Sequence, residues 1–337
     1  GGAINFLGIM AYYILSPFSL LVLIIPRDYI YLMVSVIIAF KIVACSITCL
    51  YFLRTYFKNL PSLLSILLAI IYAFSGYGLV MYQITPWIDA MYMLPLVAIG
   101  LKQVLDLEKP TFYIITLSLS LIFSFYVSIM TILFIFLGSF IYLLVYKEKE
   151  DRKKAVASLG IFTILSLLIS LVVVLPAYLQ ISESYRTGFN LQVILNSKLG
   201  TITDKLGMLM FGGLLYAGIL FLLIRFKKHK KFLTFYIPCL LFLLIPIVIE
   251  PIHRLMLFGS YACFPYRFGY IFVLFMIIGT AYIFNDFDKI KGKVFKYNKI
   301  ISGVIAITSS LMMILITYKY YSRIQNAIYR LTLAVDH

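Results

Sequence analysis

The chain has 337 residues, of which 63% are hydrophobic and only 12% are charged. Because a soluble domain keeps roughly a quarter of its residues charged, this composition excludes a water-soluble globular protein and predicts an integral membrane protein. The net charge of +16 is carried by short loops between apolar runs, which argues against a nucleic-acid partner and for contact with anionic headgroups of the lipid bilayer.

Apolar runs bounded by charged residues predict about ten membrane spans. Since a span needs ~20 mostly apolar residues, ten spans would occupy roughly 60% of the chain, in agreement with its hydrophobic fraction. A further apolar run, 4–25, is interrupted by Ser16-Pro17 and either spans the membrane or lies at its outer interface. We therefore expect an all-α transmembrane bundle over 1–318 and an outer-face tail over 319–337. The predicted spans are 31–53, 60–80, 88–105, 111–126, 128–146, 156–178, 206–224, 232–250, 265–284 and 300–318.

The segment from Thr111 to Tyr146 contains 36 residues without a charge. As one straight helix it would be ~54 Å long, far longer than a ~30 Å hydrocarbon core. A single crossing would also put its flanks, Lys109 and the basic stretch 147–154, on opposite sides of the membrane. A turn near Phe125-Tyr126-Val127 keeps both flanks on one side, so we predict a hairpin of two spans.

Positively charged loops set the predicted orientation. With the hairpin in place, five loops share one side of the membrane and carry 19 of the 29 Lys and Arg residues. The positive-inside rule assigns that side to the cytoplasm. These inner loops are 54–58, 102–109, 147–154, 225–231 and 285–299. The outer segments are 81–88, 180–205, 251–264 and the tail after 318.

Two charged residues stand inside apolar segments and need partners. Lys41 lies near the middle of its span, where a charge costs ~2.5–3.5 kcal/mol on insertion scales. It either contacts a phosphate or carboxylate from the outer side or forms a structural ion pair. Asp89 follows Trp87 at the outer start of a span, and its carboxylate requires a cation, a metal or a substrate hydroxyl. Trp87 is a site candidate, but a tryptophan at the membrane interface is also expected on its own.

A second group of candidates surrounds the outer segment 251–264. Glu250 and Arg267 lie at the outer ends of two spans, and His253 lies between them. The planar guanidinium of Arg267 suits phosphate oxygens. The alternative is an interfacial aromatic belt with one salt bridge. Three tyrosines could form an aromatic wall for a sugar or a prenyl chain: Tyr261, Tyr266 and Tyr270.

Several catalytic signatures are missing from the sequence. It holds no Walker loop, no GxSxG, no HExxH and no strand–helix GxGxxG motif, and its inner loops are too short for a nucleotide-binding domain. These features exclude an ATP-driven pump built from this chain alone. The sequence shows no cysteine or histidine spacing typical of a metal site. The cofactor is therefore unknown, and a requirement for a divalent metal is still an open alternative.

Four short motifs carry a family resemblance: AYYILSPF at 11–18, IYAFSGY at 71–77, WIDA at 87–90 and FPYRF at 264–268. On these motifs, and with Lys41 in the next span, the sequence resembles the bacterial YfhO-like membrane proteins over nearly its whole length. That family is of the GT-C glycosyltransferase type and is linked to the glycosylation of cell-wall polymers such as teichoic acids.

The resemblance implies transfer of a sugar from a polyprenyl-phosphate donor to a cell-envelope glycopolymer or glycolipid. The reaction would take place on the extracytoplasmic face of the bacterial plasma membrane. The resemblance further implies that Lys41 and Arg267 hold phosphate, while Trp87 and Asp89 line the sugar pocket.

The sequence does not identify the catalytic residue, and it leaves more than one function open. GT-C enzymes place a catalytic carboxylate in their first outer loop, which would lie upstream of Gly1. We therefore expect this chain to be a fragment, and its catalytic residue is unassigned. Two other functions stay open: a transporter or flippase of a lipid-linked saccharide, and a non-catalytic partner in envelope assembly.

Overall fold

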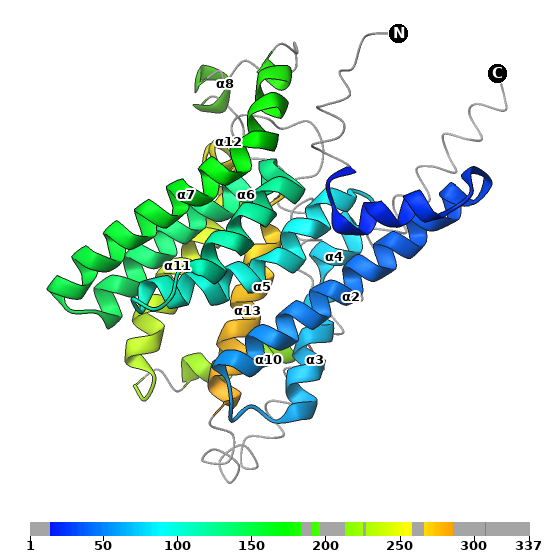
Figure 1. Ribbon diagram of the computed structural model, residues 1–337. Coiled ribbons are helices and arrows are strands. Elements are labelled where there is room, and N and C mark those ends of the chain that lie inside the picture. Colours follow the sequence, from blue (N-terminus) through cyan, green and yellow to red (C-terminus); the bar gives the residue numbers. More distant parts are fainter. Residues whose placement is uncertain are drawn as a thin grey trace.

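The computed structural model describes residues 14–182, 191–195, 213–224, 227–257, 266–285 and 307. Every regular element in these ranges is a helix, which confirms the predicted all-α bundle (Figure 1). The predicted tail 319–337 and Tyr261 lie outside the described residues, as do all but one residue of the predicted span 300–318.

The first half of the chain enters the bundle through short 3-10 helices. Ser16-Pro17 begins the helix η2, and η3 leads into the long α2, which contains Lys41. The predicted span 60–80 is two helices. The first ends at Ala73, and Ser75 caps the second, since its Oγ accepts the Gly78 N–H at 3.4 Å. The elements are η2 (Pro17–Ile24), η3 (Arg27–Tyr29), α2 (Ile30–Tyr56), α3 (Ser62–Ala73), α4 (Gly76–Met81) and α5 (Thr85–Leu105).

The second half supplies the remaining helices. The predicted span 265–284 corresponds to a helix of 16 residues, and the predicted span 232–250 ends where a short helix begins at Glu250. The elements are α6 (Thr111–Tyr146), α7 (Lys149–Ser182), α8 (Leu191–Leu195), α10 (Gly213–Ile224), α11 (Lys230–Val248), α12 (Glu250–Met256) and α13 (Gly269–Phe284).

Six of the described helical segments are long and apolar enough to cross a membrane. Their outward faces are exposed and apolar, as on α7, where Val172 is 82% exposed and Ile161 is 61% exposed. Exposing such large apolar faces to water would be energetically unfavourable, whereas lipid chains solvate them. Together with the composition, these faces identify a multi-pass membrane protein.

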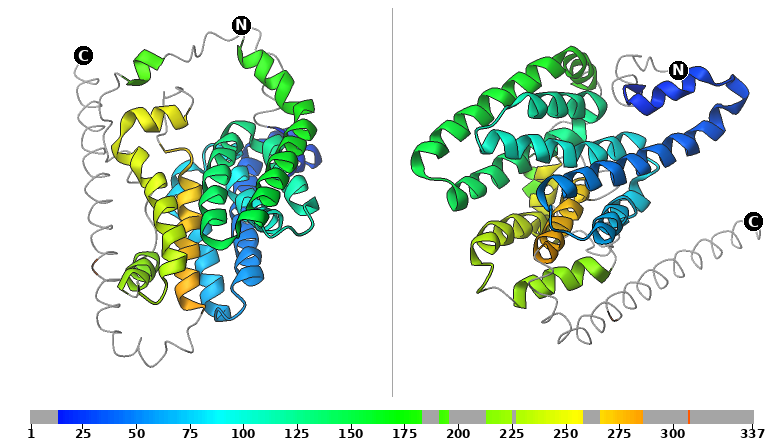
Figure 2. Two further views of the ribbon diagram at one scale, coloured as in Figure 1. Left: turned by 90° about the vertical axis from the view of Figure 1, so that its left-hand side faces the viewer. Right: turned by 60° about the horizontal axis from the view of Figure 1, so that its bottom comes forward.

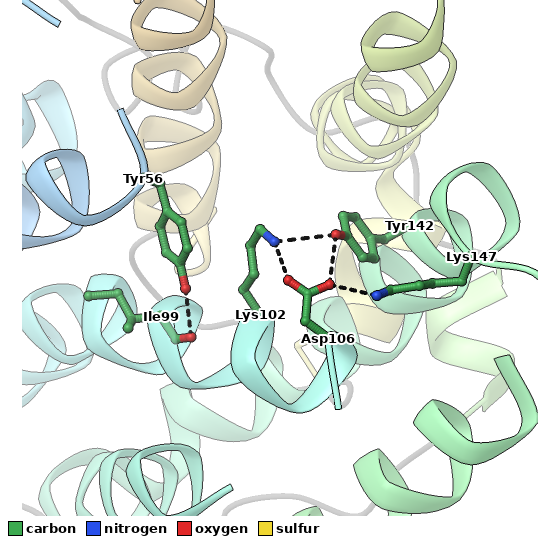
Figure 3. A network of polar contacts seen from close by, with 6 residues as sticks. All are labelled: Tyr56, Ile99, Lys102, Asp106, Tyr142 and Lys147. Carbon is green, nitrogen blue, oxygen red and sulfur yellow. Dashed lines mark hydrogen bonds and ion pairs between the residues drawn. The ribbon is translucent and has the colours of Figure 1, made fainter. Parts of the chain in front are cut away.

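The helix α6 folds back on itself at Ser124, whose backbone is non-helical (φ −155°, ψ 66°). Ser128 Oγ donates to the Ser120 carbonyl at 2.7 Å, although eight residues of straight helix would separate the two by ~12 Å. At the opposite end, Lys147 forms a 2.9 Å ion pair with Asp106 (Figure 3). The two ends of the segment therefore meet, which confirms the predicted hairpin and places its turn at Ser124.

The helix α13 lies at the centre of the bundle (Figure 2) and is buried along almost its whole length. It contacts α10, α3 and α11. A Cβ added at Gly279 would lie 2.5 Å from Ile219 Cδ1 and 2.6 Å from Tyr236 Oη. Glycine at this position therefore lets three helices approach closely, which is the usual packing device between membrane helices.

Loops predicted to share the inner side meet at one end of the bundle. Just after the first of these loops, the Asn59 N–H donates to Asn285 Oδ1 at 3.1 Å. Lys231 Nζ lies 5.0 Å from the ring centroid of Tyr146, and the Lys147–Asp106 pair joins two further inner loops. The described parts of the predicted inner loops thus form one end of the molecule, the inner end.

Described residues in or next to the segments predicted to be outer meet at the opposite end, the outer end. The Tyr77 hydroxyl donates to the Arg267 carbonyl at 2.8 Å. Tyr126, in the turn of the α6 hairpin, donates to the Leu257 carbonyl at 3.3 Å. This arrangement agrees with the predicted loop parity, and the assignment of the inner end to the cytoplasm rests on the positive-inside rule.

The hairpin predicts that Lys109 and Lys149, two exposed residues that flank α6 in the chain, face the same side of the membrane. In a cysteine-free background, Lys109→Cys and Lys149→Cys should both react with a membrane-impermeant maleimide from the cytoplasmic side only. Labelling of the two variants from opposite sides would contradict the hairpin.

Candidate functional site

Lys41 and Asp89 form a buried ion pair between α2 and α5. Lys41 Nζ lies 2.8 Å from Asp89 Oδ2, and each side chain is 1% exposed. The same ammonium donates to the Thr85 carbonyl at 3.1 Å, and Ser16 Oγ donates to Asp89 Oδ1 at 2.9 Å. The two charges that the sequence left without partners are therefore each other's partner.

The first turn of α5 positions this pair. Thr85 and Asp89 are four residues apart, so both lie on the helix face that meets α2. Pro86 occupies an N-terminal position of α5, where its missing N–H costs nothing. Trp87 is two residues before Asp89 and therefore projects from a different face.

Trp87 meets Arg267 on that other face of α5. The guanidinium carbon of Arg267 lies 5.3 Å from the Trp87 ring centroid and 5.4 Å from that of Tyr126. Arg267 Nη1 also donates to the Tyr126 hydroxyl at 2.8 Å. Trp87 is buried and Arg267 is half-buried, so a cation is held on aromatic surfaces at the outer end of the bundle.

His253 and Glu250 support the chain just before α13. Tyr266 has a φ of 60°, a left-handed conformation that costs a non-glycine residue roughly 1–2 kcal/mol. Its N–H donates to His253 Nε2 at 2.9 Å, and its hydroxyl donates to the Leu243 carbonyl at 2.6 Å. Glu250 lies beneath, with Oε1 3.7 Å from His253 Nδ1. These contacts hold the turn that directs Arg267.

The candidates thus form three local groups rather than one cluster. Lys41 joins Asp89, Trp87 joins Arg267, and Glu250 and His253 join Tyr266. Two of the groups are linked through α5, and two through the adjacent residues Tyr266 and Arg267. In this arrangement His253 accepts the Tyr266 backbone N–H, and Glu250 lies next to His253. That these two residues contact a substrate is still a prediction.

Sequence reasoning missed three residues of these groups: Ser16, Tyr126 and Tyr92, whose hydroxyl interacts with the Asp89 and Ser16 side chains. Ser16 stands in the AYYILSPF motif, and Tyr126 stands in the predicted hairpin turn, so both were visible in the sequence. Their partners were not visible, because each contact joins helices far apart in the chain. Tyr92 gave no signal beyond its place one helical turn after Asp89.

A further polar network at the inner end was not predicted (Figure 3). Asp106 hydrogen-bonds to Lys102, pairs with Lys147 at 2.9 Å and accepts from the Tyr142 hydroxyl at 3.3 Å. Tyr56 joins from α2 by donating to the Ile99 carbonyl at 3.0 Å. Burial alone would raise the pKa of Asp106, but its hydrogen bonds and charge contacts with the two lysines outweigh burial and lower that pKa.

Comparison with known protein families identifies the chain. The family described as "Bacterial membrane protein YfhO" matches residues 2–335. The chain belongs to the YfhO family. No curated protein and no solved structure matches it, so the functional assignment for this YfhO-family protein rests on its own geometry. Across the part of the chain that the structure describes, no three His, Cys, Asp or Glu residues gather as a metal site.

The buried Lys41–Asp89 pair should show strong coupling in a double-mutant cycle. Lys41→Met or Asp89→Leu alone leaves an unpaired buried charge and should lower the free energy of unfolding by about 3–5 kcal/mol. The Lys41→Met/Asp89→Leu double variant should recover most of that loss. The free energy of unfolding of all three variants is measured in SDS. If the loss in the double variant equalled the sum of the two single losses, the pairing would be refuted.

Asp106 should stabilise the protein in a pH-dependent way. Because its pKa is lower in the folded state than its ordinary value of 3.8, its contribution is present above that value and is lost as pH falls through the lowered pKa. Asp106→Asn should therefore lower the thermal unfolding midpoint at pH 7, and the gap to wild type should narrow below about pH 4. Asp28→Asn, at an exposed carboxylate, should leave the midpoint at pH 7 unchanged. A gap that stays constant down to pH 3 would contradict this role.

Proposed function

We propose that this YfhO-family protein is a membrane glycosyltransferase. It moves a sugar from a polyprenyl-phosphate donor to a cell-envelope glycopolymer or glycolipid on the extracytoplasmic side. The observation that carries the proposal is the Arg267 guanidinium, held against Trp87 and Tyr126 at the outer end of the bundle. Family membership supports the setting, a bacterial membrane.

Arg267 suits the phosphate of such a donor. A guanidinium presents a planar fork of N–H donors that matches phosphate oxygens, and stacking on aromatic rings keeps that fork in place. Tyr126 fixes the guanidinium through a 2.8 Å hydrogen bond. A cation that is held in place stabilises the charge that develops on a departing polyprenyl phosphate without further reorganisation.

Lys41 has a different role in this proposal from the one that the resemblance implies. Its ammonium is neutralised by Asp89 at 2.8 Å, so the pair offers no net positive charge to a phosphate. Lys41 instead orients the Asp89 carboxylate, and Asp89 and Trp87 are left for the sugar. The catalytic carboxylate itself is unassigned.

Transport of a lipid-linked saccharide is the second candidate. It is favoured by two interrupted helical segments: α3 gives way to α4 between Ala73 and Gly76, and α11 gives way to α12 between Val248 and Glu250. Interrupted helices often form the substrate sites of membrane transporters. A transfer assay and a flipping assay on the same proteoliposomes separate the two functions.

Substitution of Arg267 tests the enzyme proposal. With a radiolabelled polyprenyl-phosphate hexose and membrane-derived acceptor in proteoliposomes, Arg267→Ala should lower sugar transfer about 100-fold, as loss of one preorganised electrostatic contact does. Arg267→Lys should retain only part of the wild-type transfer rate, since lysine keeps the positive charge but lacks the planar fork of N–H donors.

The control is Arg54→Ala, an exposed arginine in the last turn of α2, which should transfer at the wild-type rate. Full transfer by Arg267→Ala would remove the assignment of Arg267. Flipping of the donor without any transfer by the wild-type protein would favour the transporter.

A further inference from the structure

The IYAFSGY motif at 71–77 places two buried tyrosines on either side of a helix break. Tyr72 lies near the end of α3 and Tyr77 lies in the first turn of α4, and both are 0% exposed. A buried phenol needs a hydrogen-bond partner, because leaving its hydroxyl unpaired is costly. Each of these phenols donates to a main-chain carbonyl outside its own helix.

Tyr72 satisfies a carbonyl that α5 itself cannot satisfy. In a regular helix the Met91 carbonyl would accept the N–H of the residue four positions later, but that residue is Pro95, which has no N–H. The Tyr72 hydroxyl donates to the Met91 carbonyl instead, at 2.7 Å. Met91 is one helical turn after Trp87, on the same face of α5. Tyr72 therefore holds α5 on the face that carries Trp87.

Tyr77 holds the main chain of Arg267. Its hydroxyl donates to the Arg267 carbonyl at 2.8 Å, and its ring lies against the ring of Tyr270, with centroids 5.4 Å apart. Gly269 leaves room for this approach, since an added Cβ would lie 3.2 Å from Tyr77 Cδ2. Tyr77 therefore fixes the backbone from which the Arg267 guanidinium projects.

The break between α3 and α4 sets how the two tyrosines are placed. Ser75 caps α4 by accepting the Gly78 N–H. A Cβ added at Gly78 would overlap the Ala73 carbonyl oxygen, so glycine permits the close turn. One short segment can therefore direct one phenol to α5 and the other to the turn before α13.

We propose that Tyr72 and Tyr77 form a clamp that holds Trp87 and Arg267 against each other, with Tyr77 as a positioning residue for Arg267. Because both tyrosines are fully buried, they act through the residues that they hold. The role of the clamp in sugar transfer rests on the proposed glycosyltransferase function, in which Arg267 binds the donor phosphate.

The contact that the clamp maintains depends on geometry. The guanidinium carbon of Arg267 lies 5.3 Å from the Trp87 ring centroid, and a cation–π contact weakens beyond about 6 Å. A charge stabilises a transition state best when it is already in place and needs no rearrangement. Loss of the Tyr77 hydroxyl should therefore slow the transfer step more than it weakens binding of the donor.

The fluorescence of Trp87 reports this contact, because Trp87 is the only tryptophan in the 337-residue sequence. Tyr77→Phe removes the hydroxyl and keeps the ring. In nanodiscs without substrate, its tryptophan emission spectrum should shift from that of wild type toward that of Arg267→Ala. Tyr72→Phe should shift the spectrum as well, because it frees the main chain of α5 near Trp87. In the transfer assay, Tyr77→Phe should lower kcat about three- to tenfold, the effect of one lost hydrogen bond, with KM for the donor unchanged.

Tyr236→Phe is the matched control, because it also removes a buried hydroxyl that donates to a carbonyl, that of Phe275 at 2.9 Å. It should keep the wild-type spectrum, kcat and KM. A wild-type spectrum or a wild-type kcat for Tyr77→Phe, or equal changes in the control, would overturn the positioning role. An unchanged spectrum for Tyr72→Phe would remove Tyr72 from the clamp. A shifted spectrum for Tyr77→Phe without any transfer by wild type would keep the clamp and overturn the glycosyltransferase function.

Discussion

A lysine and an aspartate inside an apolar bundle must neutralise each other, and the rest of the outer end depends on that requirement. The 2.8 Å contact of Lys41 with Asp89 fixes the first turn of α5 against α2. Because both side chains are buried in a medium that solvates charge poorly, separating them would be costly. The position of α5 then determines where Trp87 points.

Trp87 and the turn before α13 together create the cationic surface of the outer end. Tyr266 adopts a left-handed backbone that His253 stabilises by accepting its N–H. Gly269 allows the Tyr266 ring to lie close, since an added Cβ would come within 2.9 Å of Tyr266 Cδ1. Arg267 is thereby aimed at Trp87 rather than at lipid. The strained turn at Tyr266 and the buried Lys41–Asp89 pair thus both position the contact between Arg267 and Trp87.

Sequence reasoning reached the parts of the structure that follow from membrane thickness and charge. Length and flanking charges were enough to predict the hairpin of α6. They could not show that Lys41 and Asp89 are mutual partners, because that depends on which helices pack together. The role of His253 depends on the φ angle of Tyr266, which no local pattern in FPYRF reveals. The break at Ser75 had a visible signal, a helix-capping serine before glycine, and it was missed.

The central claim is that the saccharide and its lipid phosphate bind at the outer end, on two faces of the first turn of α5. A polyprenyl-phosphate hexose with a photoreactive diazirine on the hexose tests it most directly, by crosslinking to the full-length protein and mapping of the labelled peptides. Labelling of residues 85–92, lost on competition with unmodified donor, is the expected result. Labelling confined to the inner end, at residues 102–109 or 147–154, would contradict the account.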